Sequence, residues 1–439
     1  MEPYLVDELI VEGSRIVTRA HPRFRSKHLT DDFFVQYEDD VSLDALDESI
    51  LIIPFLLNVL PLVWISGETY RIRSLDAELA AALDGIRRTF RTLYPGISWQ
   101  GELIPDETVT HPPADESDEI ALLFSGGADS AYSSLMHRET PQLLITILSA
   151  LGVADWRSDA ARASARAHFR AFASRHGHRN RFVTSNLCEF IAARKLVGVW
   201  PRPRRWLLDV QYGLGFASLA APLLHEAGPR ELRLASCESD YFRFPGGAHS
   251  DVIHSIRWSG VKVLGDGVEK RRQQKLHAIH TMMPRETGEP LILKPCLGPV
   301  GQFENCCACA KCLQTIVGLI AEGANPQTYG FAREPRLVFS TLRKKLSSYR
   351  FDLRGIAELL EWLDIQVAIH ELIANPRWAD VCRTAGEAEL RWLAGFDLVR
   401  YFTRYHSRFR QCIRYVRWRV GRLIDLWPAF GRLVRRLLR

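Results

Sequence analysis

Apolar runs alternate with amphipathic stretches between residues 119 and 235. The runs EIALLF (119–124), QLLITILSAL (142–151), RFVTSNL (181–187) and RELRLA (230–235) predict strands, and the stretches between them have helical spacing. Strands that are apolar throughout and separated by helices favour a parallel sheet covered on both faces. The pattern therefore predicts an α/β domain with a parallel sheet.

The flanking regions have other patterns. Residues 1–115 combine short predicted strands with one long helix, and the polar segment 111–119, which contains two prolines, predicts a linker. The chain is nearly all helical after a cysteine cluster that ends at residue 312. We therefore predict an N-terminal α+β accessory domain (1–115), the parallel-sheet domain (116–325) and a helical C-terminal region (326–439).

The composition is that of a soluble globular protein, with 47% hydrophobic and 25% charged residues among 439. The longest apolar run, 52–65, is broken by two prolines and predicts a buried strand or short helix rather than a membrane span. The first residues carry acids and lack the apolar core of a signal peptide. We expect a cytoplasmic protein, and a membrane is not an expected partner.

Positive charge is concentrated at the end of the chain. Residues 391–439 contain thirteen arginines and two acidic residues, so this tail carries +11 and the rest of the chain −5. Its apolar positions have helical spacing, at Phe402, Tyr405, Phe409, Cys412, Ile413, Val416, Val420, Leu423, Ile424 and Trp427. Three interpretations stay open: a helix docked on the body, a surface for nucleic acid or a protein partner, and a helix lying on an anionic membrane.

Small polar residues follow the first predicted strand of the parallel sheet. The sequence SGGADS comprises Ser125, Gly126, Gly127, Ala128, Asp129 and Ser130. Glycines between a strand and a helix let backbone N–H groups approach an anion, and the helix N-terminus favours negative charge. Asp129 would cap the helix or help to hold Mg²⁺ beside a polyphosphate. The alternative is a tight turn without a ligand. The loop lacks the lysine and spacing of a Walker A motif.

Five cysteines lie within residues 296–312. Cys306, Cys309 and Cys312 form CxxCxxC, and Cys296 is available as a fourth thiolate for tetrahedral zinc. Cys307 is adjacent to a ligand and cannot readily share the ion. Structural thiols, a disulfide and an iron–sulfur cluster are the alternatives. We expect a closed structural zinc site beside the loop.

The two motifs together resemble a known family. SGGADS is similar to the SGGxDS signature of the PP-loop ATP pyrophosphatases. Combined with the cysteine pattern about 165 residues later, it resembles the 7-cyano-7-deazaguanine synthase family. ENCCACAKCLQTIVGL resembles the zinc segment of the anti-phage defence (Qat-type) branch, in which glycine usually stands at the position of Cys307. DGVEKRRQQKLHAI (266–279) is similar to a further family stretch. The resemblance covers about residues 119–320; residues 1–115 also look like the extra domain of the defence branch.

The resemblance implies an adenine nucleotide alpha hydrolase-like, Rossmann-like fold and an ATP-dependent ligase. A 7-carboxy-7-deazaguanine carboxylate would be adenylated with release of pyrophosphate, and an amine would displace AMP. The implied cofactors are ATP, Mg²⁺ and structural Zn²⁺. The amine would be ammonia or that of a protein or nucleic acid, and protein partners from a defence operon are expected. The non-enzymatic alternative is a degenerate PP-loop scaffold that binds nucleotide and partners.

Site residues follow from the matched motifs. SGGADS would bind ATP and pyrophosphate, with Asp129 and Ser130 catalytic. Arg272 and Lys275, one helical turn apart, would reach phosphate oxygens; their alternative is a solvated basic helix surface. The end of the last predicted strand and the segments after it supply further substrate candidates, namely Ser236, Asp240, Asp251 and Asp266.

Overall fold

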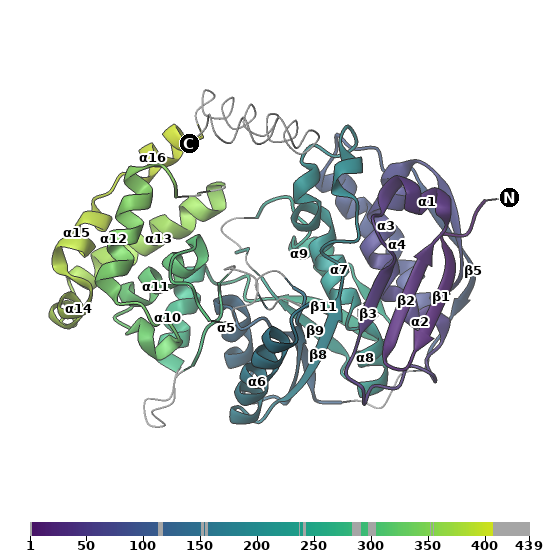
Figure 1. Ribbon diagram of the computed structural model, residues 1–439, viewed down its shortest axis with the longest axis horizontal. Coiled ribbons are helices and arrows are strands. Elements are labelled where there is room, and N and C mark those ends of the chain that lie inside the picture. Colours follow the sequence, from purple (N-terminus) through teal and green to yellow (C-terminus); the bar gives the residue numbers. More distant parts are fainter. Residues whose placement is uncertain are drawn as a thin grey trace. The chain divides into compact units, whose positions relative to one another are not determined.

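The computed structural model describes residues 2–112, 117–150, 153, 157–236, 238–239, 243–282, 291–296, 304–351, 353 and 355–406. The chain divides into two compact units, Met1–Ala332 and Arg333–Arg439 (Figure 1). Asp240 and the arginine-rich tail beyond residue 406 lie outside the described residues.

A nine-stranded sheet forms the centre of the first unit, in the order β1-β2-β3-β8-β7-β6-β9-β11-β10. Its five middle strands, β8-β7-β6-β9-β11, run parallel. The mixed α/β class with a large, mostly parallel sheet is therefore confirmed. The strands are β1 (Val6–Glu12), β2 (Arg15–Ala20), β3 (Phe33–Gln36), β6 (Ile120–Leu123), β7 (Gln142–Ile147), β8 (Arg179–Ser185), β9 (Glu231–Ala235), β10 (Arg257–Trp258) and β11 (Val261–Asp266).

Helices cover both faces of the parallel strands. As a result β7, for example, is buried at every position. In Figure 1, α5 and α6 lie on one side of the sheet, and α7 and α8 on the other. The helical segments of this unit are α1 (Pro22–His28), α2 (Glu48–Leu51), α3 (Ile53–Ser66), α4 (Ala77–Leu93), α5 (Ala128–Met136), α6 (Asp159–Arg175), η1 (Ala193–Leu196), η2 (Pro203–Arg205), the π-helical turn η3 (Leu207–Gln211), α7 (Tyr212–Ser218), α8 (Ala221–Ala227), α9 (Ser250–His254), α10 (Arg272–Met282), α11 (Ala310–Ala321) and η4 (Pro326–Tyr329).

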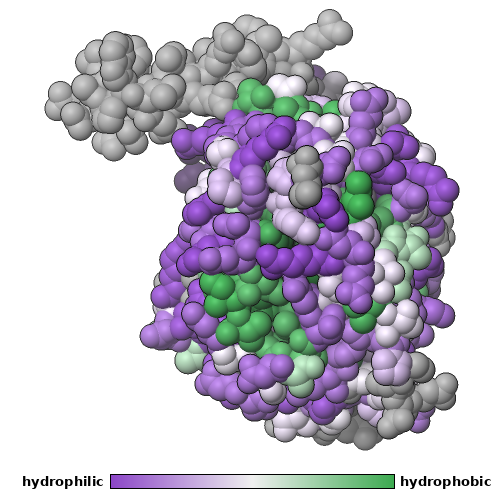
Figure 2. Space-filling model, turned by 90° about the vertical axis from the view of Figure 1, so that its right-hand side faces the viewer, coloured by the Kyte–Doolittle hydropathy of each residue, from purple (hydrophilic) through white to green (hydrophobic). Residues whose placement is uncertain are grey.

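The N-terminal residues belong to the same sheet as the parallel strands. β1, β2 and β3 pair antiparallel, and β3 joins β8 through the pair Val35↔Ser185. A separate parallel pair, β4 (Thr69–Asp76) with β5 (Glu102–Val109), completes this region. β1, β2 and β3 thus share one sheet with the parallel strands, and the whole N-terminal region belongs to the same compact unit as those strands. Figure 2 shows a mainly hydrophilic face of the molecule, interrupted by an apolar area.

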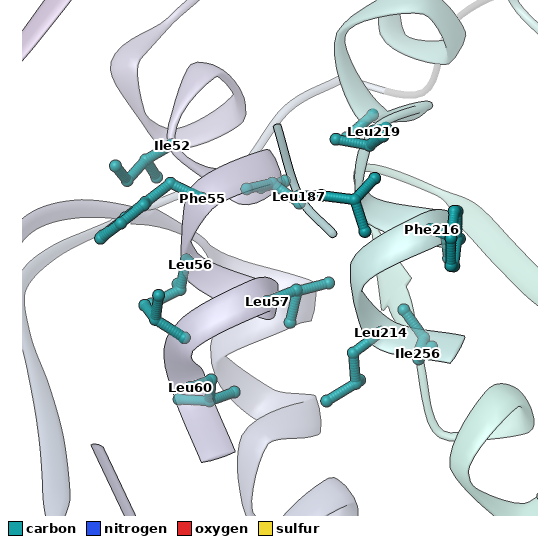
Figure 3. Packing of buried hydrophobic residues seen from close by; sticks show 14 of the residues in the cluster. Ile52, Phe55, Leu56, Leu57, Leu60, Leu187, Leu214, Phe216, Leu219 and Ile256 are labelled. Atoms are coloured by element: carbon teal, nitrogen blue, oxygen red, sulfur yellow. The ribbon is translucent and has the colours of Figure 1, made fainter. Parts of the chain in front are cut away.

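The apolar run 52–65 forms the buried helix α3. Residues 53–64 are all buried, and Leu57 of α3 packs in the cluster that includes Leu214 of α7 (Figure 3). Among the described residues, the helical stretch Leu207–Glu226 is long and apolar enough to cross a membrane, but 83% of its most apolar part is buried inside the structure. Both segments therefore contribute to the core of the first unit.

The second unit is helical through residue 406, with α12 (Pro335–Ser347), α13 (Ile356–Ile373), α14 (Trp378–Ala385), α15 (Glu387–Ala394) and α16 (Leu398–Tyr405). The buried Gln366 amide of α13 donates to the carbonyls of Leu393 and Phe396, at 2.7 and 2.8 Å. The Tyr401 hydroxyl of α16 donates to Phe351 O at 2.8 Å. The first two bonds join α13 to the end of α15, and the third joins α16 to the segment that precedes α13.

Candidate nucleotide site and four-cysteine cluster

The SGGADS loop lies where the strand order reverses. β6 is the first of the five parallel strands of the nine-stranded sheet, with β7 and then β8 on one side and β9 and then β11 on the other. The connection after β6 leads to β7 on one side and the connection after β8 leads to β9 on the other, so the order reverses between β6 and β9, where open α/β sheets form a crevice at the carboxyl ends of their strands. Ser125, Gly126 and Gly127 connect β6 to α5 at this edge. Open α/β sheets bind their ligands in such a crevice.

Short contacts fix the shape of the loop. Gly126 has φ +72°, and its carbonyl accepts a 2.6 Å hydrogen bond from the Lys294 N–H. The hydroxyls of Ser125 and Ser130 are 3.2 Å apart, and Ser130 also donates to Gly127 O. Gly127 is the N-cap of α5 and supplies no side-chain cap. The first N–H groups of α5 therefore have no side-chain acceptor, which suits an anion.

Gly126→Ala should destabilise the loop, whereas Gly127→Ala should not. A Cβ at Gly126 would lie 2.8 Å from the Phe169 ring in a left-handed conformation; at Gly127 the nearest atom is Ser125 Oγ at 3.5 Å. We expect Gly126→Ala to lower the free energy of unfolding by about 1–3 kcal/mol. Urea unfolding of both variants measures the difference. Equal stability of the two variants would contradict this account of the loop.

Asp129 lies in the first turn of α5 and pairs with two cations of α10. Its carboxylate accepts from Arg272 Nη2 at 2.5 Å and from Lys275 Nζ at 3.4 Å. Burial alone would raise the pKa of Asp129, but the charges of Arg272, Lys275 and Lys311 outweigh it and lower that pKa to about 2. The interpretation of Asp129 as a helix cap is wrong, because Gly127 occupies that position.

Neither α10 cation lies on a solvated helix surface, since Lys275 is buried and Arg272 is largely covered. The side chains of Lys275 and Arg272 are 1% and 10% exposed. Lys275 Nζ also donates to Ser236 O at 2.5 Å, and Arg272 Nη1 donates to Gln314 Oε1 at 3.3 Å. Lys275 thus connects the loop after β6 to the segment after β9. Lys311 also acts on Asp129, so three cations together lower the pKa of this carboxyl.

The other predicted substrate residues do not all lie at this edge. Ser236 directly follows β9, is buried, and donates its N–H to Asp266 O at 2.8 Å. The Asp266 carboxylate accepts from Ser133, from His137 at 3.1 Å and from Arg233 at 3.4 Å. These contacts fasten α5 to the end of β11. Asp251 is 63% exposed in the first turn of α9 and lines a 360 Å³ pocket formed mainly by α4.

Sequence reasoning missed Glu238. This side chain is 2% exposed, two residues beyond Ser236, and accepts N–H groups of Phe244 at 3.4 Å and Ser250 at 3.3 Å. Burial raises the pKa of the Glu238 carboxyl to about 7, against smaller opposing effects of these N–H donors and Arg243. The sequence offered one indication of Glu238: it is an acidic residue three positions after the end of a predicted strand, between the candidates Ser236 and Asp240.

The pKa of Glu238 predicts a pH-dependent stability. The pKa of Glu238 in the folded state is above its ordinary value of 4.5, so the folded state holds this proton more tightly than the unfolded state does. The resulting stabilisation of the fold is fully present below pH 4.5 and is lost as the pH rises through about 7. We expect Glu238→Gln to remove up to about 3 kcal/mol of this pH dependence. Urea unfolding of wild type and variant at about pH 5 and about pH 8 measures it. Parallel pH profiles would contradict the assignment.

Four cysteines form a cluster that fits one metal ion. The sulfur atoms of Cys296, Cys306, Cys309 and Cys312 all lie within 4.8 Å of one another, and none of the four forms a disulfide. Backbone N–H groups donate to Sγ of Cys296, Cys306 and Cys309 at 3.3 to 3.4 Å. Tetrahedral zinc with bonds of about 2.3 Å requires sulfurs about 3.8 Å apart, so small shifts suffice. The disulfide alternative is not what the structure shows.

Cys307 is not part of the cluster. Its φ of +51° is in the left-handed region that favours glycine, and its thiol lies 3.4 Å from Asn305 O. The turn between Cys306 and Cys309 requires this conformation, which explains why glycine would suit the position. The fifth cysteine therefore occupies a turn position whose backbone favours glycine and is not one of the four clustered thiols.

The cluster is attached to the SGGADS loop. Lys294, two residues before Cys296, donates its N–H to Gly126 O and its Nζ to Glu304 O at 2.8 Å. Asn305, next to Cys306, donates to Leu293 O at 2.8 Å. The two halves of the cysteine segment are thereby joined to each other and to the loop.

Comparisons of the chain with protein-family models, with curated protein sequences and with solved structures find no match.

Proposed function

We propose that this chain is a PP-loop ATP pyrophosphatase that adenylates a 7-carboxy-7-deazaguanine-type carboxylate and transfers it to an amine, as a 7-cyano-7-deazaguanine synthase-like component of anti-phage defence. The observation that carries the proposal is the position of SGGADS. The loop lies at the reversal point of a parallel sheet, beside the largely covered cations Arg272 and Lys275. The resemblance of the motifs supplies the substrate class.

The proposed reaction has two steps. A carboxylate oxygen of the heterocycle attacks the α-phosphorus of ATP, and the bond to the β-phosphate oxygen breaks with release of pyrophosphate. An amine nitrogen then attacks the acyl carbon, loses its proton to solvent or a base, and expels AMP. Both steps depend on positioning and on neutralising phosphate charge.

The residues of the site have separate roles in this proposal. The N–H groups from Gly127 onward and the hydroxyls of Ser125 and Ser130 hold the departing pyrophosphate. Arg272 and Lys275 neutralise its developing charge, and their low exposure strengthens each interaction. Asp129 keeps the two cations in place before ATP binds. Mg²⁺ would enter with ATP on its phosphate oxygens, while the cysteine thiolates would hold structural Zn²⁺.

The acceptor amine decides the product. Ammonia gives an amide, and a second adenylation followed by elimination gives a nitrile. A protein or nucleic-acid amine instead gives a conjugated macromolecule. The arginine-rich tail would supply a docking surface for such an acceptor.

Exchange of labelled pyrophosphate into ATP tests adenylation without knowledge of the acceptor. We expect exchange only when 7-carboxy-7-deazaguanine is present, because the adenylate forms reversibly before any amine is needed. Ser130→Ala should slow the exchange, since it removes a hydroxyl at the loop. Absence of exchange, together with absence of AMP when ammonium is added, would exclude the proposed reaction and favour a nucleotide-binding scaffold.

A further inference from the structure

Glu238 belongs to the segment after β9, which Lys275 connects to the first turn of α5. β9 pairs with β6 in parallel register, with Leu234 opposite Leu123, so the segments after both strands leave the sheet at one edge. Lys275 contacts both segments, through Ser236 O and the Asp129 carboxylate. Glu238 follows Ser236 by two residues, at most about 7 Å of extended chain.

The Glu238 carboxyl has unused acceptor capacity. Its two hydrogen bonds, from Phe244 N–H at 3.4 Å and Ser250 N–H at 3.3 Å, are long. A carboxylate offers about four acceptor positions. Among the described residues, no basic side chain lies within salt-bridge distance of it; Arg243 pairs with Asp251 at 4.0 Å. A buried carboxylate with so few donors is costly in the free protein, and a ligand that brings donors would offset the cost.

We propose that Glu238 determines specificity by accepting two adjacent N–H donors of a planar heterocycle; in the proposed reaction these are the N1–H and the 2-amino group of 7-carboxy-7-deazaguanine. This inference rests on the proposed function. The charges match the ligand at both ends: the 7-carboxylate faces the loop and its cations, and the donor edge of the pyrimidine ring faces the carboxylate. Glu238 thereby recognises the heterocyclic ring by hydrogen bonding, while the loop and α10 bind the triphosphate.

Equilibrium binding of two heterocycles tests the inference. Calorimetry compares 7-carboxy-7-deazaguanine with its analogue lacking the 2-amino group. The wild type should bind the complete heterocycle about 10- to 100-fold more tightly, since the analogue leaves an acceptor unpaired. Glu238→Gln should bind both within about threefold of each other, because its amide places a donor against a donor. The KM for ATP should not change.

Glu231→Gln is the matched control, at the opposite end of β9 and 41% exposed; it should retain the wild-type preference. If Glu238→Gln keeps the preference for the complete heterocycle, the inference is wrong. It is also wrong if the wild type shows no such preference, and this second result does not depend on the folding of any variant. AMP formation is scored separately. A wild type that discriminates between the heterocycles but forms no AMP would overturn the proposed reaction and support the recognition role of Glu238.

Discussion

Replacing Lys275 by methionine should lower the rate of AMP formation by about 10²–10³-fold. The side chain is 1% exposed and reaches both Asp129 and the strand end at Ser236. A charge in such a water-poor position stabilises a departing pyrophosphate more strongly than an exposed lysine does. Methionine keeps an unbranched side chain that is one atom shorter and removes the charge and its donors. Steady-state release of AMP and pyrophosphate measures the effect.

Lys270→Met is the control for this prediction, because Lys270 is an exposed lysine five residues earlier. It should retain the wild-type rate. Lys275→Met leaves Asp129 with Arg272 as its remaining partner in α10, so we expect the fold to persist. Thermal unfolding of both variants shows whether a lost rate comes from lost catalysis or from lost structure. A Lys275→Met rate within about threefold of wild type would contradict the role of this cation in transition-state stabilisation.

Cys309→Ser should abolish stable metal binding and lower the melting temperature by roughly 10 °C or more, because the binding energy of a structural metal contributes directly to folding. The same variant should weaken ATP binding by about tenfold, a loss of about 1.4 kcal/mol. The physical link is Lys294, which donates to Gly126 O in the loop and to Glu304 O in the cysteine segment. Elemental mass spectrometry, thermal unfolding and nucleotide titration measure the three effects.

Cys307→Ser provides the matched control, since Cys307 adjoins a ligand but lies outside the cluster. It should keep the metal and the ATP affinity. If Cys309→Ser lost the metal and still bound ATP as the wild type does, the coupling through Lys294 would be wrong. If Cys307→Ser lost the metal, the choice of four ligands would be wrong.

Local sequence patterns were sufficient for the parallel strands and for the cysteine cluster. The apolar runs at 119–124 and 142–151 became β6 and β7, because a strand buried on both faces needs apolar residues throughout. The CxxCxxC spacing placed its three thiols together because the turns between them are short. The buried helix α3 was ambiguous, since its residues are apolar on every side and show no clear period.

Features that depend on long-range packing could not be predicted. Val35 pairs with Ser185, 150 residues later in the sequence. The local pattern of the N-terminal strands does not indicate which sheet they join. The pairing of Asp129 with Arg272 and Lys275 depends on the docking of α10 against α5, and a basic helix stretch alone looks solvated. Glu238 was missed because its burial comes from the segment 243–250 folding over it.

The central claim is that a carboxylate oxygen attacks the α-phosphorus of ATP at the SGGADS loop. The most direct test uses 7-carboxy-7-deazaguanine labelled with ¹⁸O in its carboxylate, together with ATP and ammonium, and mass spectrometry of the released nucleotide. Our account predicts AMP that carries one labelled oxygen, because the bridging oxygen stays with phosphorus when the amine expels AMP. Unlabelled AMP, or ADP in its place, would contradict it.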